Sequence, residues 1–316
     1  MRNLKLVLSI ALVSLFIPTA SLAQSNEEQG LGVTIVTVVP KHEGEVPPSV
    51  ANQDLSVKVN GKNAKVVKWA PFNAPADHVE LVLLIDDGAR TSLGTQLTEI
   101  EAFVKTLPPN IKAAIAYMQN GRATLAAPLS NDHNQILSAL HLPSGSPGYA
   151  ASPYFCLSDL AKNWPSQDLA ARREVVMISD GVDRYDVRYD PEDPYVAAAA
   201  SDAVKAHLVV YAIYWLSRGR LDATGYENNA GQNLLLQVTQ ATGGKSFWEG
   251  LGNPVTFQPY FEDLTRRLRN QYELGFITPL NGKPEVETLK LKLTAPGDEV
   301  DAPQQVLVVP APAAQK

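Results

Sequence analysis

The chain has 316 residues and a formal net charge of −6 at pH 7, and 45% of its residues are hydrophobic, which is enough to form a core. This acidic balance argues against a nucleic-acid partner, because such partners select clustered Lys and Arg. The single cysteine, Cys156, excludes an internal disulfide, and the length allows one large domain with an appendage or two domains.

The first 23 residues have the features of a secretory signal peptide. Arg2 and Lys5 precede an apolar run from Leu6 to Ile17, and the small-x-small sequence that ends at Ala23 is typical of a cleavage site. The apolar run is too short to cross a bilayer, and no later segment approaches about 18 uninterrupted apolar residues. We therefore predict a secreted or periplasmic protein with no membrane span after cleavage; an uncleaved anchor is the alternative.

Strand signals come first along the exported chain. Residues 24–31 are polar and are expected to be disordered, and strands are predicted at 32–39 and 54–59. The second strand ends in Asn60-Gly61, a dipeptide typical of tight hairpin turns, and 66–69 is predicted as the returning strand. Accessory β-strands are therefore expected over 32–70.

Strands and helices alternate from residue 76 to residue 271. The segment 79–85 is almost entirely apolar, as expected of a parallel strand covered on both faces, and apolar residues at helical spacing follow it. Further strands are predicted at 111–118, 122–129, 175–178 and 208–215, and helices at 92–107, 195–206, 233–242 and 260–270. The alternation predicts an α/β domain with a doubly wound, mostly parallel, Rossmann-like sheet and helices on both faces.

The C-terminal part of the chain returns to strand signals and then becomes rich in Pro and Ala. No helix separates the strands of 32–70 or those of 272–295, so we expect the two segments to pair in a small accessory β unit. Residues 296–316 are expected to form a flexible tail.

An aspartate follows each of the two most apolar strands, Asp86 after 79–85 and Asp180 after 175–178. Right-handed crossovers bring the carboxyl ends of parallel strands to one edge of the sheet, and ligands of such sheets bind there. We therefore expect the function to lie at this carboxyl edge. The loops that form it are 86–92, 143–153, 180–193 and 216–228.

Several sequence blocks resemble the von Willebrand factor A (vWA) domain. They are Val79-Glu-Leu-Val-Leu-Leu-Ile-Asp86, the turn Ser179-Asp180-Gly181 after a buried strand, and Ala241-Thr-Gly-Gly244. With the additional N-terminal strands and the closing Gln271-Tyr-Glu-Leu-Gly-Phe276, the chain is similar to exported bacterial proteins described as VWFA-related. The resemblance implies a vWA fold over 76–271.

The resemblance also implies a metal-ion-dependent adhesion site, with Asp86 and Asp180 as the carboxylate ligands and Ser152 at the position of a threonine ligand. Mg²⁺ prefers about six oxygen ligands, yet Gly88 and Arg90 occupy the positions of two serines. A guanidinium repels a divalent cation, so we predict a degenerate site without a cofactor. Mg²⁺ would need replacement hydroxyls from a shifted register.

Two other roles are open for these carboxylates. Arg90 can act as an internal counter-ion to Asp86 or Asp180, in place of a cation. Alternatively, Asp86 simply caps the helix that follows it.

A protein-interaction or adhesion module that binds a protein or cell-surface partner is the function predicted from these features. The chain has neither histidines at zinc-helix spacing nor a Gly-x-Ser-x-Gly elbow, so no enzyme is predicted. The alternatives are a structural component of an envelope assembly and a metal-assisted hydrolase. The residues predicted to contact a partner at the edge are Asp87, Arg90, Asp183, Trp215, Arg218 and Arg220.

Overall fold

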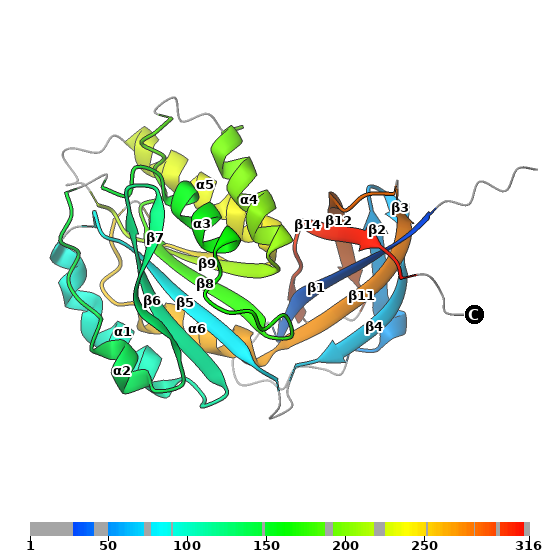
Figure 1. The fold of residues 1–316 in the computed structure, drawn as a ribbon, viewed down its shortest axis with the longest axis horizontal. Helices are drawn as coiled ribbons and strands as arrows, with labels where there is room; N and C mark the ends of the chain where they lie inside the picture. Colours follow the sequence, from blue (N-terminus) through cyan, green and yellow to red (C-terminus); the bar gives the residue numbers. More distant parts are fainter. Residues whose placement is uncertain are drawn as a thin grey trace, which may run out of the picture.

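The computed structural model describes residues 28–40, 50–72, 77–89, 91–146, 149–186, 192–217, 225–250, 252–280, 282–294 and 298–312. The predicted signal peptide over 1–23 lies outside these ranges, and so do Arg90, Arg218 and Arg220. Within the described ranges the chain is a mixed α/β protein in which two β-sheets lie next to each other (Figure 1).

A six-stranded sheet forms the centre of the helical part, with the strand order β10-β9-β8-β5-β6-β7 in the described residues. Its strands are β5 (Val79–Asp86), β6 (Ile111–Gln119), β7 (Arg122–Ser130), β8 (Arg172–Ser179), β9 (Leu208–Tyr214) and β10 (Ser246–Phe247). The first five strands in that order pair in parallel, and β7 is antiparallel to β6 because the tight turn at Asn120-Gly121 reverses the chain. Every residue of β5 is buried, as its apolar sequence predicts.

Helices cover both faces of this sheet. The described α-helices are α1 (Leu97–Thr106), α2 (His133–Leu137), α3 (Pro153–Lys162), α4 (Pro194–Lys205), α5 (Gly225–Thr242) and α6 (Gln258–Arg269), with 3₁₀ turns at Asn52–Asp54 and Thr91–Gln96. One core contains side chains of α1, α2 and α6, and the core on the opposite face contains side chains of α3, α4 and α5. Cys156 is buried in the second core, as expected of a free cysteine in an apolar segment.

The second sheet is antiparallel and larger than expected. Its strands are β1 (Glu28–Pro40), β2 (Leu55–Val59), β3 (Lys62–Asn63), β4 (Lys65–Pro71), β11 (Gln271–Leu280), β12 (Glu285–Leu293), β13 (Asp298–Asp301) and β14 (Gln305–Pro310). Their order is β3-β2-β12-β14-β1-β11-β4, with β13 paired to β1. The prediction of a small accessory unit is therefore wrong in size, because both ends of the chain contribute strands to one eight-stranded sheet in the described residues.

Three predictions for the accessory segments need correction. Residues 28–31 belong to β1 although they were expected to be disordered, because β1 pairs with β11 along its whole length up to Thr37. The predicted returning strand, β4, pairs with β11 and not with β2, whose hairpin partner is the short β3. The interval 296–316 contains β13 and β14, so it is not a flexible tail over its described residues.

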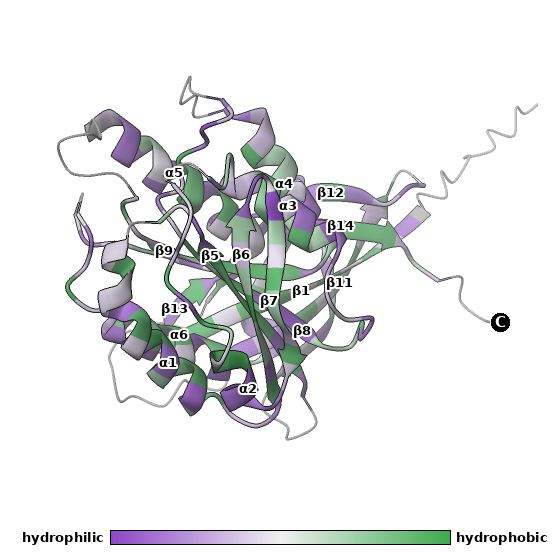
Figure 2. Cartoon of the chain, turned by 60° about the vertical axis from the view of Figure 1, so that its left-hand side comes forward, coloured by the Kyte–Doolittle hydropathy of each residue, from purple (hydrophilic) through white to green (hydrophobic). Residues whose placement is uncertain are grey.

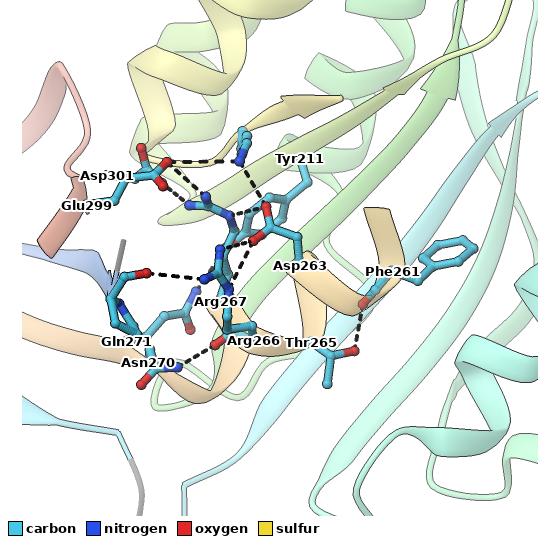
Figure 3. Close-up of polar contacts among 12 residues, drawn as sticks. Tyr211, Phe261, Asp263, Thr265, Arg266, Arg267, Asn270, Gln271, Glu299 and Asp301 are labelled. Carbon is cyan, nitrogen blue, oxygen red and sulfur yellow. Dashed lines mark hydrogen bonds and ion pairs between the residues drawn. The ribbon is translucent and has the colours of Figure 1, made fainter. Parts of the chain in front are cut away.

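An ionic network connects the helical part to the C-terminal strands. The guanidinium of Arg267 on α6 is fully buried and donates to Asp263 at 2.9 Å, to Glu299 at 3.0 Å and to Asp301. Figure 3 shows these three carboxylates pointing toward Arg267, with Glu299 and Asp301 on β13. Since buried charges are stable only when paired, α6 and β13 are held in one arrangement.

Candidate functional site

The carboxyl edge of the six-stranded sheet carries a group of buried aspartates. β5 ends at Asp86 and β8 ends at Ser179, and the parallel register pairs Ile85 with Ile178. Asp86 therefore lies beside Ser179, and Asp180 follows immediately. The structure thus brings together two of the three residues expected at a metal site. Both aspartates are only 1% exposed, so they lie beneath the surface.

The Asp86 carboxylate is held in its own turn. It accepts a hydrogen bond from the Gly88 backbone N–H at 2.8 Å and one from the Ser179 hydroxyl at 3.2 Å. Burial and, next, the negative charge of Asp180 raise the pKa of Asp86 to about 7, although these hydrogen bonds and the charge of Arg184 act to lower it. A fraction of Asp86 is therefore protonated at neutral pH.

Arg184 is the counter-ion of Asp180. Its Nη2 lies 2.6 Å from Oδ2 and its Nη1 lies 3.2 Å from Oδ1 of Asp180, so the contact is bidentate. The Ser217 hydroxyl and the Val182 backbone N–H also donate to this carboxylate. The role that sequence reasoning gave to Arg90, which lies outside the described residues, is performed by Arg184; the sequence signal was its position four residues after Asp180.

Ser152 and Asp183 form a second pair beside the first. The Ser152 hydroxyl donates to Asp183 Oδ2 at 3.0 Å, while Asp183 Oδ1 accepts from the backbone N–H of Tyr185 at 2.8 Å and of Asp186 at 3.3 Å. Both Ser152 and Asp183 are fully buried. Asp183 thus fastens the loop after β8 to the start of α3, and is not exposed for contact with a partner.

These oxygens do not fit a bound Mg²⁺ in this arrangement. Both oxygens of Asp180 are engaged by Arg184, and the Ser152 hydroxyl donates to Asp183. The described residues include no group of three or more His, Cys, Asp or Glu side chains placed to hold a metal ion. A cation at Asp180 would have to displace a guanidinium that already neutralises the carboxylate.

Two further residues expected at the binding surface are internal. Asp87 is 1% exposed and accepts from the Ser144 backbone N–H and the Gln119 side chain, both at 2.9 Å, so it anchors the loop after α2. Trp215 is 2% exposed and packs edge-to-face on Phe257 with ring centroids 5.4 Å apart. Trp215 is a core residue because β9 continues into the hydrophobic core beneath the edge.

The exposed side chains of this edge include tyrosines that the sequence reasoning did not single out. Tyr149, Tyr185 and Tyr226 are 46%, 62% and 63% exposed. Tyr185 follows β8 and Tyr226 lies at the start of α5, which follows β9, whereas Tyr149 is placed at this edge by the Asn120 backbone N–H, which donates to its carbonyl at the end of β6. Tyr185 is supported by Phe155 and Tyr195, with ring centroids 5.0 and 5.3 Å away. Sequence periodicity does not detect such residues, because they lie in loops and at helix starts.

No protein-family model and no curated protein matches the chain. Solved structures with some similarity include an aerotolerance-related membrane protein from Bacteroides fragilis, at 14% identity and a TM-score of 0.43, covering 60% of this chain and 98% of that one. The pilus adhesin SpaC from Lactobacillus rhamnosus GG has 9% identity and a TM-score of 0.44, over 86% of this chain and 48% of that one. The VWA domain of SpRpn10 has 13% identity and a TM-score of 0.34, over 60% and 94%. At these values the similarities say nothing of what the chain binds.

Proposed function

We propose that this chain is an exported, non-enzymatic interaction module of the vWA-like type, which binds a protein or cell-surface partner at the carboxyl edge of the six-stranded sheet. The observation that carries the proposal is the group of exposed tyrosines at that edge, Tyr149 and Tyr185 in loops and Tyr226 at the start of α5. Tyrosine gives a large contact area at low cost in side-chain entropy, and it is enriched in protein interfaces.

The buried aspartates support these loops from below and do not themselves contact the partner. Asp87 fixes the loop that leads to Tyr149, and Asp183 fixes the backbone of Tyr185. Arg184 neutralises Asp180 without a metal. The proposed edge is therefore a degenerate adhesion site that is pre-organised by hydrogen bonds and one internal ion pair, and it needs no cofactor.

Export is proposed from the basic, apolar and small-residue segments that precede Gln24. No helix among the described residues has the length and apolar character needed to cross a membrane. A secreted or periplasmic destination places the tyrosine loops where they can meet an envelope or surface partner.

Site-specific photo-cross-linking tests the proposed edge. A photo-reactive phenylalanine analogue placed at 185 or 226 should give the same discrete cross-linked species in the envelope fraction of the source cell. The control position is Val67, which is 47% exposed on β4 of the other sheet. The proposal fails if positions 185 and 226 give no discrete species, or if Val67 gives the same one.

A further inference from the structure

A crevice of about 490 Å³ lies between the two sheets, at the end of the six-stranded sheet opposite to the tyrosine loops. One wall is formed by β1 and β14, and the other by the start of β8, the start of β9 and the end of α4. Its volume lies within the range of small-molecule sites, which is roughly 300 to 1,000 Å³.

The strand wall of this crevice is aliphatic on a face where polar residues would be expected. One face of β1 packs on the core of its own sheet, and Gly32, Val36 and Val38 lie on that face. The alternate residues Leu31 and Val33 point the other way and are only half-buried. A strand that is apolar on both faces is normally covered on both faces.

β14 shows the same pattern. Val306 and Val308 are buried in the core of the sheet, whereas Leu307 and Val309 are half-buried and line the crevice. Figure 2 shows β14 largely in the hydrophobic colour. Together, Leu31, Val33, Leu307 and Val309 form a continuous hydrocarbon surface on adjacent strands.

The opposite wall contains a buried cation. Arg172 is 7% exposed, and its guanidinium lies over the Phe72 ring at 4.6 Å. It donates from Nη1 to the Leu268 carbonyl at 3.3 Å and to the Gln271 side chain, but its Nε has no hydrogen-bond partner and it makes no ion pair with any described residue. Buried arginines are almost always paired with an anion.

The carboxylate nearest in sequence does not supply that pair. Glu174 is fully buried and forms no ion pair with Arg172, and neither does Asp77, the other carboxylate whose charge acts on Arg172. Burial raises the pKa of Glu174 to about 7, although the charge of Arg172 lowers it, so Glu174 is only partly ionised at neutral pH. At the strand wall, Lys68 is already paired with Glu273 at 2.6 Å. Arg172 therefore remains the one crevice cation that lacks an ion-pair partner among the described residues.

We propose that this crevice binds an amphipathic carboxylate, with its hydrocarbon chain on the face of β1 and β14 and its carboxylate on Arg172. The apolar wall contacts the hydrocarbon chain of the ligand, and the guanidinium that lacks an ion pair neutralises the carboxylate of the ligand. The site is independent of the tyrosine loops and does not rest on the function proposed for them.

Titration of the chain beginning at Gln24, which retains every described residue, tests this site. Dodecanoate, kept below its micelle concentration, should bind saturably and raise the melting temperature, whereas dodecanol should bind at least about tenfold more weakly because it lacks the charge. Absence of saturable dodecanoate binding overturns the site, and equal binding of dodecanol overturns the role of Arg172.

Cavity-filling variants locate the binding. Val33→Trp and Leu307→Trp should each abolish the dodecanoate-dependent rise in melting temperature while leaving the circular dichroism unchanged. Val67→Trp, on the exposed side of β4, is the matched control and should bind as the wild type does. Wild-type affinity in both folded crevice variants would overturn the assignment.

Arg172→Met tests the head group through a ratio. Arg172 also donates hydrogen bonds to Leu268 and Gln271, so its loss can change the affinity for both ligands. The measured quantity is therefore the ratio of the affinities of the variant for dodecanoate and dodecanol, which should fall about tenfold relative to the wild type. A retained preference would show that another group holds the carboxylate.

Discussion

At the carboxyl edge, three buried aspartates are each stabilised by a different means. Asp86 is neutralised in part by a proton, Asp180 by the guanidinium of Arg184, and Asp183 is stabilised by the Ser152 hydroxyl and two backbone N–H groups. Like charges buried close together cannot all ionise without such compensation. The compensation comes from groups of the chain itself, whereas a metal-dependent adhesion site would use a bound cation.

The raised pKa of Asp86 predicts a pH-dependent stability. The folded-state pKa of about 7 lies above the ordinary value of 3.8 for an aspartate, so the native state binds this proton more tightly than the unfolded state does. The contribution is therefore fully present below about pH 4, and is lost as the pH rises to about 7. About three pKa units correspond to at most about 4 kcal/mol.

Asp86→Asn should remove that loss. Urea unfolding at pH 5 and pH 8 should show a smaller decrease in unfolding free energy for Asp86→Asn than for the wild type. Glu285→Gln, an exposed carboxyl-to-amide change on β12, is the control and should leave the wild-type slope unchanged. Parallel pH curves for Asp86→Asn and the wild type would contradict the prediction.

Arg184 predicts the response of the edge to divalent cations. Calorimetric titration of Mg²⁺ and Mn²⁺ into the wild type should show no micromolar binding, because Arg184 engages both oxygens of Asp180. Arg184→Met should lower the unfolding free energy by about 3 kcal/mol, since it leaves a buried carboxylate unpaired. Added Mg²⁺ should restore part of this loss.

Arg122→Met is the matched control for that experiment, because Arg122 is exposed on the β6–β7 hairpin. It should change neither the stability nor the cation response. Micromolar Mg²⁺ binding by the wild type would mean that Arg184 yields its place to a cation, and the metal-free account of the edge would be wrong.

At the scale of elements, β14 is the segment whose role differs most from its sequence character. It precedes a Pro/Ala-rich end, yet it lies between β12 and β1 in the interior of the eight-stranded sheet. The apolar run Val306-Leu-Val-Val309, in which three residues are β-branched, was a strand signal within the interval expected to be flexible. The Pro/Ala-rich composition of the whole tail predicted a flexible segment in spite of this short strand signal. The strands that pair with the run are distant in sequence, so local sequence does not show them.

Removal of β14 should therefore be far more damaging than removal of the end of the chain. A chain that ends at Gln304 loses the buried Val306 and Val308 and exposes the edges of β1 and β12. We expect it to lose cooperative thermal unfolding, measured by circular dichroism, and to aggregate. A chain that ends at Pro312 is the control; if both truncations unfold alike, β14 is not an essential strand.

At the scale of the whole molecule, the chain passes from the eight-stranded sheet to the six-stranded sheet and back. After it returns, the Arg267 network connects α6 to β13 of the eight-stranded sheet (Figure 3). β1 and β11, which flank the helical part in sequence, pair with each other. The two sheets are therefore expected to unfold together, although each has its own core.

Tryptophan fluorescence can check this coupling. Single-tryptophan variants that keep only Trp69 in β4 or only Trp215 next to β9 should report coincident urea transitions. Arg267→Met should lower the unfolding free energy by about 2 kcal/mol and separate the two transitions, since it removes the charged hydrogen bonds that join α6 to Glu299 and Asp301 on β13. Arg269→Met, exposed on the same helix, should do neither. Separate transitions in the wild type would refute the coupling.

The sequence by itself determined the features that depend on local periodicity and turn chemistry. The mixed α/β character followed from apolar strands alternating with amphipathic helices, and the turns at Asn60-Gly61 and Asn120-Gly121 followed from residues that tolerate positive φ. The places of Asp86 and Asp180 after two buried strands followed from the same pattern.

Only the tertiary structure decided the features that depend on partners distant in sequence. Long-range pairing placed β14 inside a sheet and created the crevice in which Arg172 lies opposite an aliphatic wall. Burial turned Trp215 into a core residue, and the turn after β8 gave Arg184 the role of counter-ion to Asp180. Periodicity shows which face of a segment is apolar, but the element that covers that face is selected by packing across the whole chain.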